Sequence, residues 1–506
     1  MTVSRKNLIF HIAVFVTTVL WFSVFAVARI DMHHDAIMLK PAIDVAAGKA
    51  IFRDTFCQYG ALAVWLQALA VKLFGGEIVV TQLLTVLFYG GIAVMIDVIF
   101  RRYLSFPFRL VNLGLFWGMA YFYMVPMHPW SSVYALFFML LSTEFLLRFI
   151  AEEHRSEAFW SGAFASLAFL ARHPCGVMIA FAGALTLALS AWRLKRSWRG
   201  LGWFTSGGAA VLALFALYLT VVGAWGDYLR QCFGFVCSFA VERGGDLQWG
   251  EISKRFFPIN EVLGPIDLIF TVMPLVCVAV ALKSFLALSD AKAEAGRRKL
   301  EYFAVALAGV VSWHQYYPVA CLRHLYWAGI PMFGVFALVA EHLWRSRSRV
   351  VACRAAAVLL LLLGAIPVFF RAYWGTRVVL KHYPRRMTID IPGCRGLQLS
   401  VTEWNMLYAM NAAYQALPAE LRERGVFNYT PDAVVTVMFP ETKFRHPMFV
   451  NWKNSVYPDY SQLALDYILR NRPVLVSQEP LALPGYQLIF QGELYGLGYW
   501  MYAPLY

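Results

Sequence analysis

The sequence predicts a polytopic α-helical membrane protein with about eleven transmembrane helices and a small C-terminal α/β domain outside the membrane. Of the 506 residues, 60% are hydrophobic and only 15% are charged, which leaves too little polar surface for a soluble protein of this size. Apolar runs long enough to span a bilayer recur, since about 20 residues cross the hydrocarbon. After residue 371 the runs become shorter and are punctuated by Pro and Gly.

The first apolar run extends from Leu8 to Val27 and follows the basic pair Arg5 and Lys6. It is too long for the apolar part of a signal peptide, and many runs follow it. We therefore expect an uncleaved first helix with its N-terminus in the cytoplasm. The other predicted spans lie near residues 78–100, 108–126, 131–150, 157–171, 176–192, 201–222, 263–284, 302–318, 325–343 and 350–371.

Basic clusters between the predicted helices indicate their direction. If the chain crosses eleven times from a cytoplasmic N-terminus, all five clusters are cytoplasmic, as the positive-inside rule requires. They are Arg101-Arg102, Arg148–Arg155, Arg193–Arg199, Arg297–Lys299 and Arg345–Arg349. The net charge of +14 therefore marks cytoplasmic loops and gives no support for nucleic-acid binding. We expect a multi-pass protein of the bacterial inner membrane, with a transmembrane module at 1–371 and a periplasmic domain at 372–506.

Two segments leave the topology open. Residues 56–74 are apolar but carry polar side chains, and a crossing there would move every later basic cluster to the other side. We predict an amphipathic helix at the interface or against the bundle. The runs at 157–171 and 176–192 are short and meet at Arg172, so they are either two short spans or a broken pair whose tip lies within the membrane.

The C-terminal region has the pattern of an α/β domain. A helix is predicted at Glu403–Leu417, and short strands at Ala433–Met438, Pro473–Ser477 and Gln487–Phe490.

The eight cysteines show no CxxC pair or zinc spacing. Cys232 and Cys237 are near enough in sequence to form a disulfide if their loop faces an oxidising compartment. The alternative is that these cysteines pack as small apolar side chains.

Ionisable residues crowd the start of the first outer loop, residues 29–77. Asp31, His33, His34 and Asp35 follow the first membrane helix directly. Because the two carboxylates are four residues apart, a helix there would place both on one face. Such density at a membrane surface is by default a functional-site hypothesis, and the alternative is a solvated cluster at the interface.

The same loop resembles the first-loop signature of GT-C glycosyltransferases, which include protein O-mannosyltransferases and the aminoarabinose transferases that act on lipid A. The resemblance rests on His34-Asp35-Ala36, Gly48, Ile51-Phe52-Arg53-Asp54 and Tyr59-Gly60-Ala61-Leu62, and on the layout of spans and C-terminal domain. This chain has His34-Asp35 where members often carry Asp-Glu or Asp-x-Asp, and Ala61 where Pro is common.

The resemblance implies an inverting transferase that moves a sugar from a polyprenyl-phosphate donor to an envelope glycan, a lipid such as lipopolysaccharide, or a protein. Asp35 is then the first candidate for the base that deprotonates the acceptor hydroxyl, and Asp31 is the second, as base or metal ligand. His33 and His34 would position substrate or share a cation. Whether a divalent cation binds Asp31 and Asp35 stays open, although imidazole and carboxylate both suit one.

The leaving lipid phosphate requires positive partners. Arg172 and His173 lie at the helix break, and Arg323 and His324 lie at the outer mouth of the tenth predicted span. An Arg offers a planar fork for phosphate oxygens, whereas the alternative for Arg323 is anchoring in an aromatic belt. The remaining substrate-binding candidates are Arg53, Asp54, Tyr59, Lys72 and His314.

Three other functions compete with this one. A transporter or flippase for a lipid-linked sugar would favour repeated halves, which the sequence does not show. An O-antigen-ligase-like enzyme would use a polyprenyl-diphosphate donor and a large outer loop in mid-chain, where this chain has a modest loop at 223–264. A structural membrane protein whose outer domain binds a partner would have no need of the carboxylate cluster.

Overall fold

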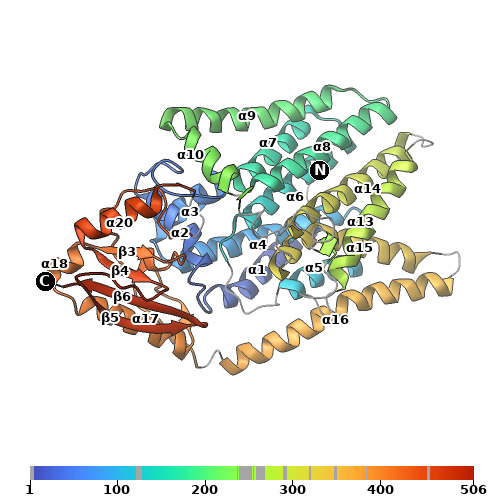
Figure 1. Cartoon of the computed structure of the whole chain (residues 1–506). Coiled ribbons are helices and arrows are strands. Elements are labelled where there is room, and N and C mark those ends of the chain that lie inside the picture. The colour runs from blue at the N-terminus through green and yellow to red at the C-terminus, as the bar shows by residue number, and fades with distance from the viewer. Residues whose placement is uncertain are drawn as a thin grey trace.

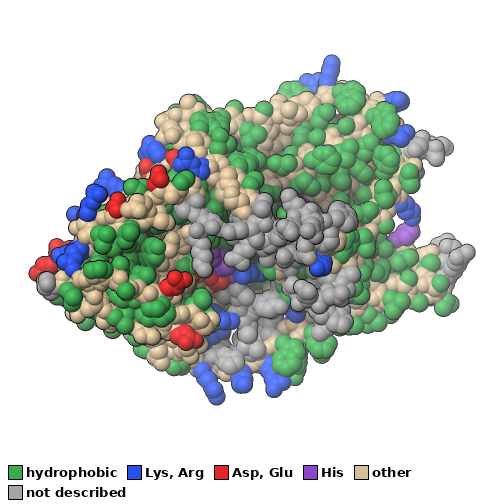
Figure 2. Space-filling view, in the orientation of Figure 1, with side chains coloured by type: hydrophobic (Ala, Val, Ile, Leu, Met, Phe, Trp, Pro, Cys, Tyr) green, Lys and Arg blue, Asp and Glu red, His purple; other side chains and the backbone are tan. Residues whose placement is uncertain are grey.

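The computed structural model describes residues 5–120, 128–235, 237–238, 253–254, 256–257, 268–288, 293–317, 321–346, 350–382, 385–452 and 456–505. A long helical bundle is joined at one end to a smaller α/β domain formed by the C-terminal part of the chain (Figure 1). Hydrophobic side chains cover much of the visible face of the bundle (Figure 2). This is the surface expected where helices face lipid, because the bilayer core offers no hydrogen-bond partners.

Within the described residues, eleven helices make up the bundle, and each overlaps one predicted span. They are α1 (Arg5–Ala26), α4 (Ile78–Phe100), α5 (Phe106–Ala120), α6 (Ser131–Glu152), α7 (Arg155–Ala171), α8 (His173–Arg193), α9 (Arg199–Val222), α13 (Ile269–Leu286), α14 (Ala293–Ser312), α15 (Leu322–Arg345) and α16 (Val350–His382). Eight of them, all except α5, α7 and α14, are long and apolar enough to cross a membrane. The chain is thus a multi-pass membrane protein, as predicted.

The helix break at residue 172 is a single extended residue. Arg172 separates α7 from α8 with φ −151° and ψ 110°, and Pro174 lies in the first turn of α8, where its missing N–H costs nothing. A Cβ at Gly176 would lie 2.1 Å from the backbone nitrogen of Phe169, so only glycine allows the two helices to approach this closely.

Two short helices of the first loop lie between the bundle and the C-terminal domain (Figure 1). They are α2 (His34–Ala46) and α3 (Ala61–Phe74), and they pack against each other. The 14 residues of α3 extend about 21 Å, which is too short to cross about 30 Å of hydrocarbon. This length agrees with the interfacial or bundle-packed helix predicted within 56–74.

The C-terminal domain contains a four-stranded sheet in the order β3-β4-β6-β5. The parallel pair β3/β4 is extended by antiparallel pairing of β6 with β4 and of β5 with β6. The elements are β1 (Met387–Thr388), β2 (Gln398–Leu399), α17 (Val401–Gln415), α18 (Ala419–Glu423), β3 (Val426–Tyr429), α19 (Val435–Met438), α20 (Tyr460–Asn471), β4 (Val474–Ser477), β5 (Tyr486–Leu494) and β6 (Leu497–Pro504). The predicted helix near 403–417 and the strands near 473–477 and 487–490 are confirmed.

The strand predicted at Ala433–Met438 is wrong, because a turn and the short helix α19 occupy this segment. Oδ1 of Asn428 accepts hydrogen bonds from the backbone nitrogen and hydroxyl of Thr430, which folds the chain directly after β3. The helix α19 then packs against α2, and the backbone nitrogen of Val434 donates to the carbonyl oxygen of Met32, just before α2, at 3.0 Å. Tertiary burial explains their hydrophobicity without a strand.

The C-terminal domain is hydrogen-bonded to both ends of the first loop. Gln398 pairs with the chain just after α1, since its backbone nitrogen donates to Val27 O at 2.6 Å and its carbonyl accepts from Arg29 N at 3.0 Å. At the other end, Ile78 N donates to Gly393 O at 2.9 Å. The first loop is therefore enclosed between the bundle and the domain.

Candidate active site

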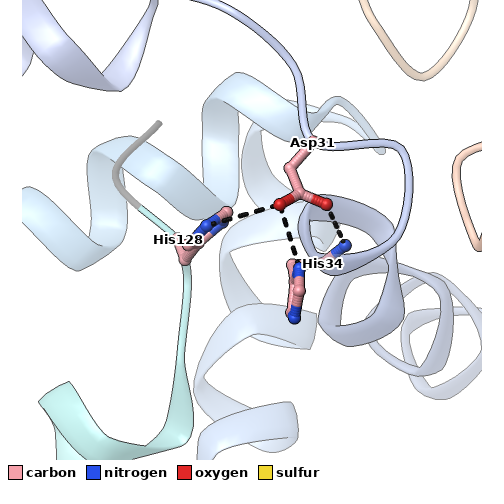
Figure 3. Close-up of side chains that lie close together, drawn as sticks. All are labelled: Asp31, His34 and His128. Carbon is pink, nitrogen blue, oxygen red and sulfur yellow. Dashed lines mark hydrogen bonds and ion pairs between the residues drawn. The ribbon is translucent and has the colours of Figure 1, made fainter. Parts of the chain in front are cut away.

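Asp31 is the centre of a cluster at the start of α2. Its Oδ1 accepts hydrogen bonds from the backbone nitrogens of His33 at 3.0 Å and His34 at 2.8 Å, as the side chain of an N-capping residue does. Its Oδ2 lies 2.9 Å from Nδ1 of His34 and 3.6 Å from Nε2 of His128 (Figure 3). Although burial opposes ionisation, the two imidazoles hold the pKa of Asp31 well below its usual value, so this carboxylate is charged.

Asp35 lies behind Asp31 and is fully buried. Its Oδ2 accepts a hydrogen bond from the backbone nitrogen of Asp31 at 2.8 Å, and its Oδ1 lies 3.0 Å from Nδ1 of His128. Burial, and then the negative charge of Asp31, raise the pKa of Asp35 to about 8. The Asp31 side chain is 24% exposed, against 0% for Asp35. Asp31 is thus the accessible, ionised carboxylate of the two.

The raised pKa of Asp35 predicts a pH-dependent stability. Its unfolded-state pKa is about 3.9, so its stabilising contribution is full below about pH 4 and is lost as the pH rises through about 8. We expect the melting temperature of the wild type to fall between about pH 5 and pH 8 by at least about 2–4 °C more than that of Asp35→Asn. Parallel melting profiles for the two proteins would show that Asp35 ionises normally.

The C-terminal domain reaches this cluster through His33. Nδ1 of His33 lies 2.7 Å from the carbonyl oxygen of Pro431 and 3.8 Å from Oδ1 of Asp432, and its ring packs edge-on to Trp452. Burial and the neighbouring His34 lower the pKa of His33 to about 4. The neutral His33 ring carries its proton on Nδ1 and donates it in a hydrogen bond to the Pro431 carbonyl oxygen. Its Nε2 is therefore a hydrogen-bond acceptor.

Asp432 is a further buried carboxyl group at the junction. The Tyr499 hydroxyl donates to its Oδ2, and Nε2 of Gln478 donates to the same oxygen at 2.5 Å. Burial raises the pKa of Asp432 to about 6, and the nearby Asp31 adds to the rise. The junction of first loop and domain thus concentrates three carboxyl groups.

Two buried donor groups near His34 and Tyr59 have no hydrogen-bond partner among the described residues. The Trp130 ring packs 5.1 Å from both His34 and Tyr59, and the Arg172 guanidinium lies 5.9 Å from the Tyr59 ring centre. Nε1 of Trp130 and Nη1 of Arg172 are buried and donate to no described group. Leaving buried donors unpaired costs about 1–3 kcal/mol each, so this arrangement favours a bound acceptor such as an anion.

Arg323 contributes positive charge to the same region. After burial, its charge is the main cause that keeps the pKa of His128 well below the usual value. Burial raises the pKa of Tyr59, and the charges of Arg172 and Arg323 partly oppose that rise. Two arginines, one from α15 and one at the α7–α8 break, therefore act electrostatically on one site.

Several predicted site residues make other contacts. Arg53 and Asp54 pair with each other at 2.8 Å, and Arg53 also donates to Val222 O at 3.0 Å. Lys72 is exposed near the end of α3, about 16 Å along the helix from Ala61.

The other predicted histidines have partners of their own. His173 Nε2 lies 3.0 Å from the Tyr228 hydroxyl, and His314 Nδ1 lies 2.7 Å from Val311 O. The His324 ring packs against Trp327. None of these three contacts reaches Asp31.

Sequence reasoning missed His128, Trp130, Asp432 and Trp452. The first two had a usable signal, because His128-Pro129-Trp130 forms a polar and aromatic turn between two predicted spans on the outer side. The other two lie about 400 residues from Asp31 in the sequence, and no local pattern connects them to it.

One group of three side chains could hold a metal ion. The ligand atoms of Asp31, His34 and His128 lie within 4.8 Å of one another (Figure 3). A carboxylate with two imidazoles suits Zn²⁺ or another divalent transition metal. The set differs from the predicted pair, because the Asp35 oxygens face His128 Nδ1 and a backbone nitrogen.

No protein-family model and no curated protein sequence matches the chain. Several solved structures match the chain. ArnT from Cupriavidus metallidurans bound to undecaprenyl phosphate is 12% identical, with a TM-score of 0.54 over 99% of this chain and 98% of that one, and the apo state gives 0.53. The apo oligosaccharyltransferase of Archaeoglobus fulgidus is also 12% identical, with a TM-score of 0.51 over 92% of this chain and 69% of that one. The chain therefore has the fold of these GT-C glycosyltransferases.

Proposed function

We propose that the protein is an inverting glycosyltransferase that moves a sugar from a polyprenyl phosphate to a hydroxyl-bearing acceptor. We further propose that the end of the bundle facing the C-terminal domain is the outer, periplasmic side. The observation that carries the proposal is a cluster in which the ionised Asp31 contacts His34 and the Trp130 ring packs on His34. In this cluster Nε1 of Trp130 and Nη1 of Arg172 are buried without a hydrogen-bond partner among the described residues. The fold shared with a protein bound to undecaprenyl phosphate supports the lipid carrier.

The site offers both halves of a displacement reaction. Asp31 is fixed by two backbone amides and by His34, so its Oδ2 is positioned to accept the proton of an attacking hydroxyl. Arg172, Trp130 and Arg323 supply donors and positive charge for the lipid phosphate that leaves. Because the sugar would lie between base and phosphate, attack occurs opposite the leaving group and inverts the anomeric carbon.

The decisive assay uses purified protein in lipid nanodiscs with a polyprenyl-phosphate sugar and candidate acceptors of the cell envelope. We expect release of the free polyprenyl phosphate together with a glycosylated acceptor, without an ion gradient. Movement of intact donor across a vesicle membrane would instead indicate a flippase. Turnover only with a polyprenyl diphosphate would indicate the ligase-like reaction.

In the alternative role of Asp31, as a metal ligand and not as the base, a cation held by Asp31, His34 and His128 would neutralise charge next to the reacting sugar. We expect calorimetric titration of the apo protein with Zn²⁺ to show one site, weakened more than about tenfold by His128→Ala. His154→Ala is the matched control, since its side chain is 67% exposed and pairs only with Glu152 in the described structure. Equal Zn²⁺ affinity in the wild type and His128→Ala would place any bound cation elsewhere.

A further inference from the structure

Two buried cysteines from distant parts of the chain lie beside the backbone carbonyl of Tyr59. Cys57 lies in the first loop, and Cys232 lies in the π-helical turn η1 (Arg230–Gly234). They are 3% and 4% exposed. Both thiols donate to the carbonyl oxygen of Tyr59, at 3.3 Å and 3.4 Å, and Cys232 Sγ also lies 3.6 Å from the Cys57 carbonyl oxygen. Two thiols that share one acceptor are close neighbours.

The residue next to Cys232 holds the two segments in register. Oε1 of Gln231 accepts from the backbone nitrogen of Cys57 at 2.9 Å, and its Nε2 donates to Phe52 O at 2.7 Å. Gln231 thus links η1 to the first loop at two points, at Cys57 itself and at Phe52. Cys237, the partner that sequence spacing suggested for Cys232, is exposed, whereas the Cys232 thiol points to the first loop.

We propose that Cys57 and Cys232 form a disulfide in the mature protein. The inference rests on the proposed assignment of this face to the outer, oxidising compartment, where such bonds persist. One cysteine thiolate attacks a disulfide-bearing oxidant and displaces one of its sulfurs, and the second cysteine then resolves the mixed disulfide. The two cysteines lose two electrons and two protons, and the oxidant leaves as a dithiol.

The thiol–disulfide exchange would take place during folding, while the first loop and η1 are still docking. Burial raises the pKa of the Cys57 thiol to about 12 and also raises that of Cys232, so once packed neither supplies much thiolate, the reactive form. The finished bond would close a long loop of the chain and so restrict the unfolded state. It would also fix the backbone that carries the Tyr59 ring against Trp130 and Arg172.

Peptide mapping of full-length protein extracted without reductant tests the bond. Free thiols are alkylated in denaturant before digestion. We expect a cross-linked peptide pair lighter by two hydrogen atoms than the sum of its parts, and both cysteines alkylated only after reduction. Cys57→Ser should release Cys232 for alkylation, while Cys277→Ser, a buried cysteine within α13, should leave the cross-link unchanged. Free Cys57 and Cys232 in most wild-type molecules, or a bridge from Cys232 to Cys237, overturns the proposal.

A second measurement tests the assignment of this face to the outer side independently of the Cys57–Cys232 disulfide. Because Cys237 is exposed, a membrane-impermeant maleimide should label it in intact cells if this face is outer. Labelled Cys237 with both buried thiols free refutes the disulfide and leaves the topology standing. Unlabelled Cys237 together with free Cys57 and Cys232 refutes both the assigned face and the disulfide.

Discussion

Asp31→Asn is expected to lower the rate of sugar transfer by about 10²–10⁴-fold, because it removes the proton acceptor. The substitution should preserve the fold, since Asn caps a helix start about as well as Asp and its Oδ1 can still accept from the backbone nitrogens of His33 and His34. The measurement is release of polyprenyl phosphate by purified variants, with the melting temperature as a check on folding.

Two neighbouring carboxylates give this experiment its controls. Asp54→Asn alters a partly exposed group that pairs with Arg53 and accepts a hydrogen bond from Ala50 N in the same loop, and it should keep near-normal turnover. Asp35→Asn replaces a buried carboxyl group that is largely protonated at neutral pH with a neutral amide of similar shape, so its loss should be smaller than that of Asp31→Asn. Normal turnover by Asp31→Asn, or a larger loss in Asp35→Asn, would return the role of base to Asp35.

Arg172→Met is expected to reduce kcat/KM for a polyprenyl-phosphate donor by about 10²–10³-fold, the usual effect of removing one donor to developing charge. Arg172→Lys should recover only part of this, because an ammonium lacks the planar fork that meets two phosphate oxygens. The measurement is initial rate against donor concentration, which separates KM from kcat.

The matched control is Arg53→Met, since that guanidinium is half exposed and already paired with Asp54. It should change kcat/KM by less than about threefold, in keeping with the small worth of exposed ion pairs. If Arg172→Met behaves like Arg53→Met, the phosphate binds elsewhere, and Arg323 becomes the next residue to replace.

Much of the fold could be predicted because membrane helices are specified locally. About 20 consecutive apolar residues suffice to define a span, and each predicted span overlaps a helix of the bundle. The C-terminal domain was harder, because short apolar segments fit strand and helix alike. Residues 433–438 form a turn and a short helix because Asn428 bends the chain after β3 and because α19 packs against α2. The contact with α2 joins residues about 400 positions apart, so the sequence around 433–438 does not reveal it.

The candidate site, like the fold, could be predicted from the sequence only in part. Asp31, His34, Tyr59 and Arg172 stand at predicted loops and breaks, and the structure does bring them together. The resemblance put Asp35 ahead of Asp31 as the base, and the sequence alone could not show which of the two carboxyl groups the fold buries. Nor could it supply Asp432, whose position follows from the docking of a domain formed at the other end of the chain.

The pairing of Gln398 with the residues after α1 has a consequence for biosynthesis. The ribosome makes Asp31 and His34 early, whereas Gln398, which pairs with the chain after α1, and Asp432 are translated more than 360 residues later. The nascent chain therefore carries Asp31 and His34 through most of its synthesis without the C-terminal domain that encloses the first loop. A chain that ends before residue 398 should therefore insert a helical bundle whose first loop lacks the hydrogen bonds to Gln398 and the contact of His33 with Asp432.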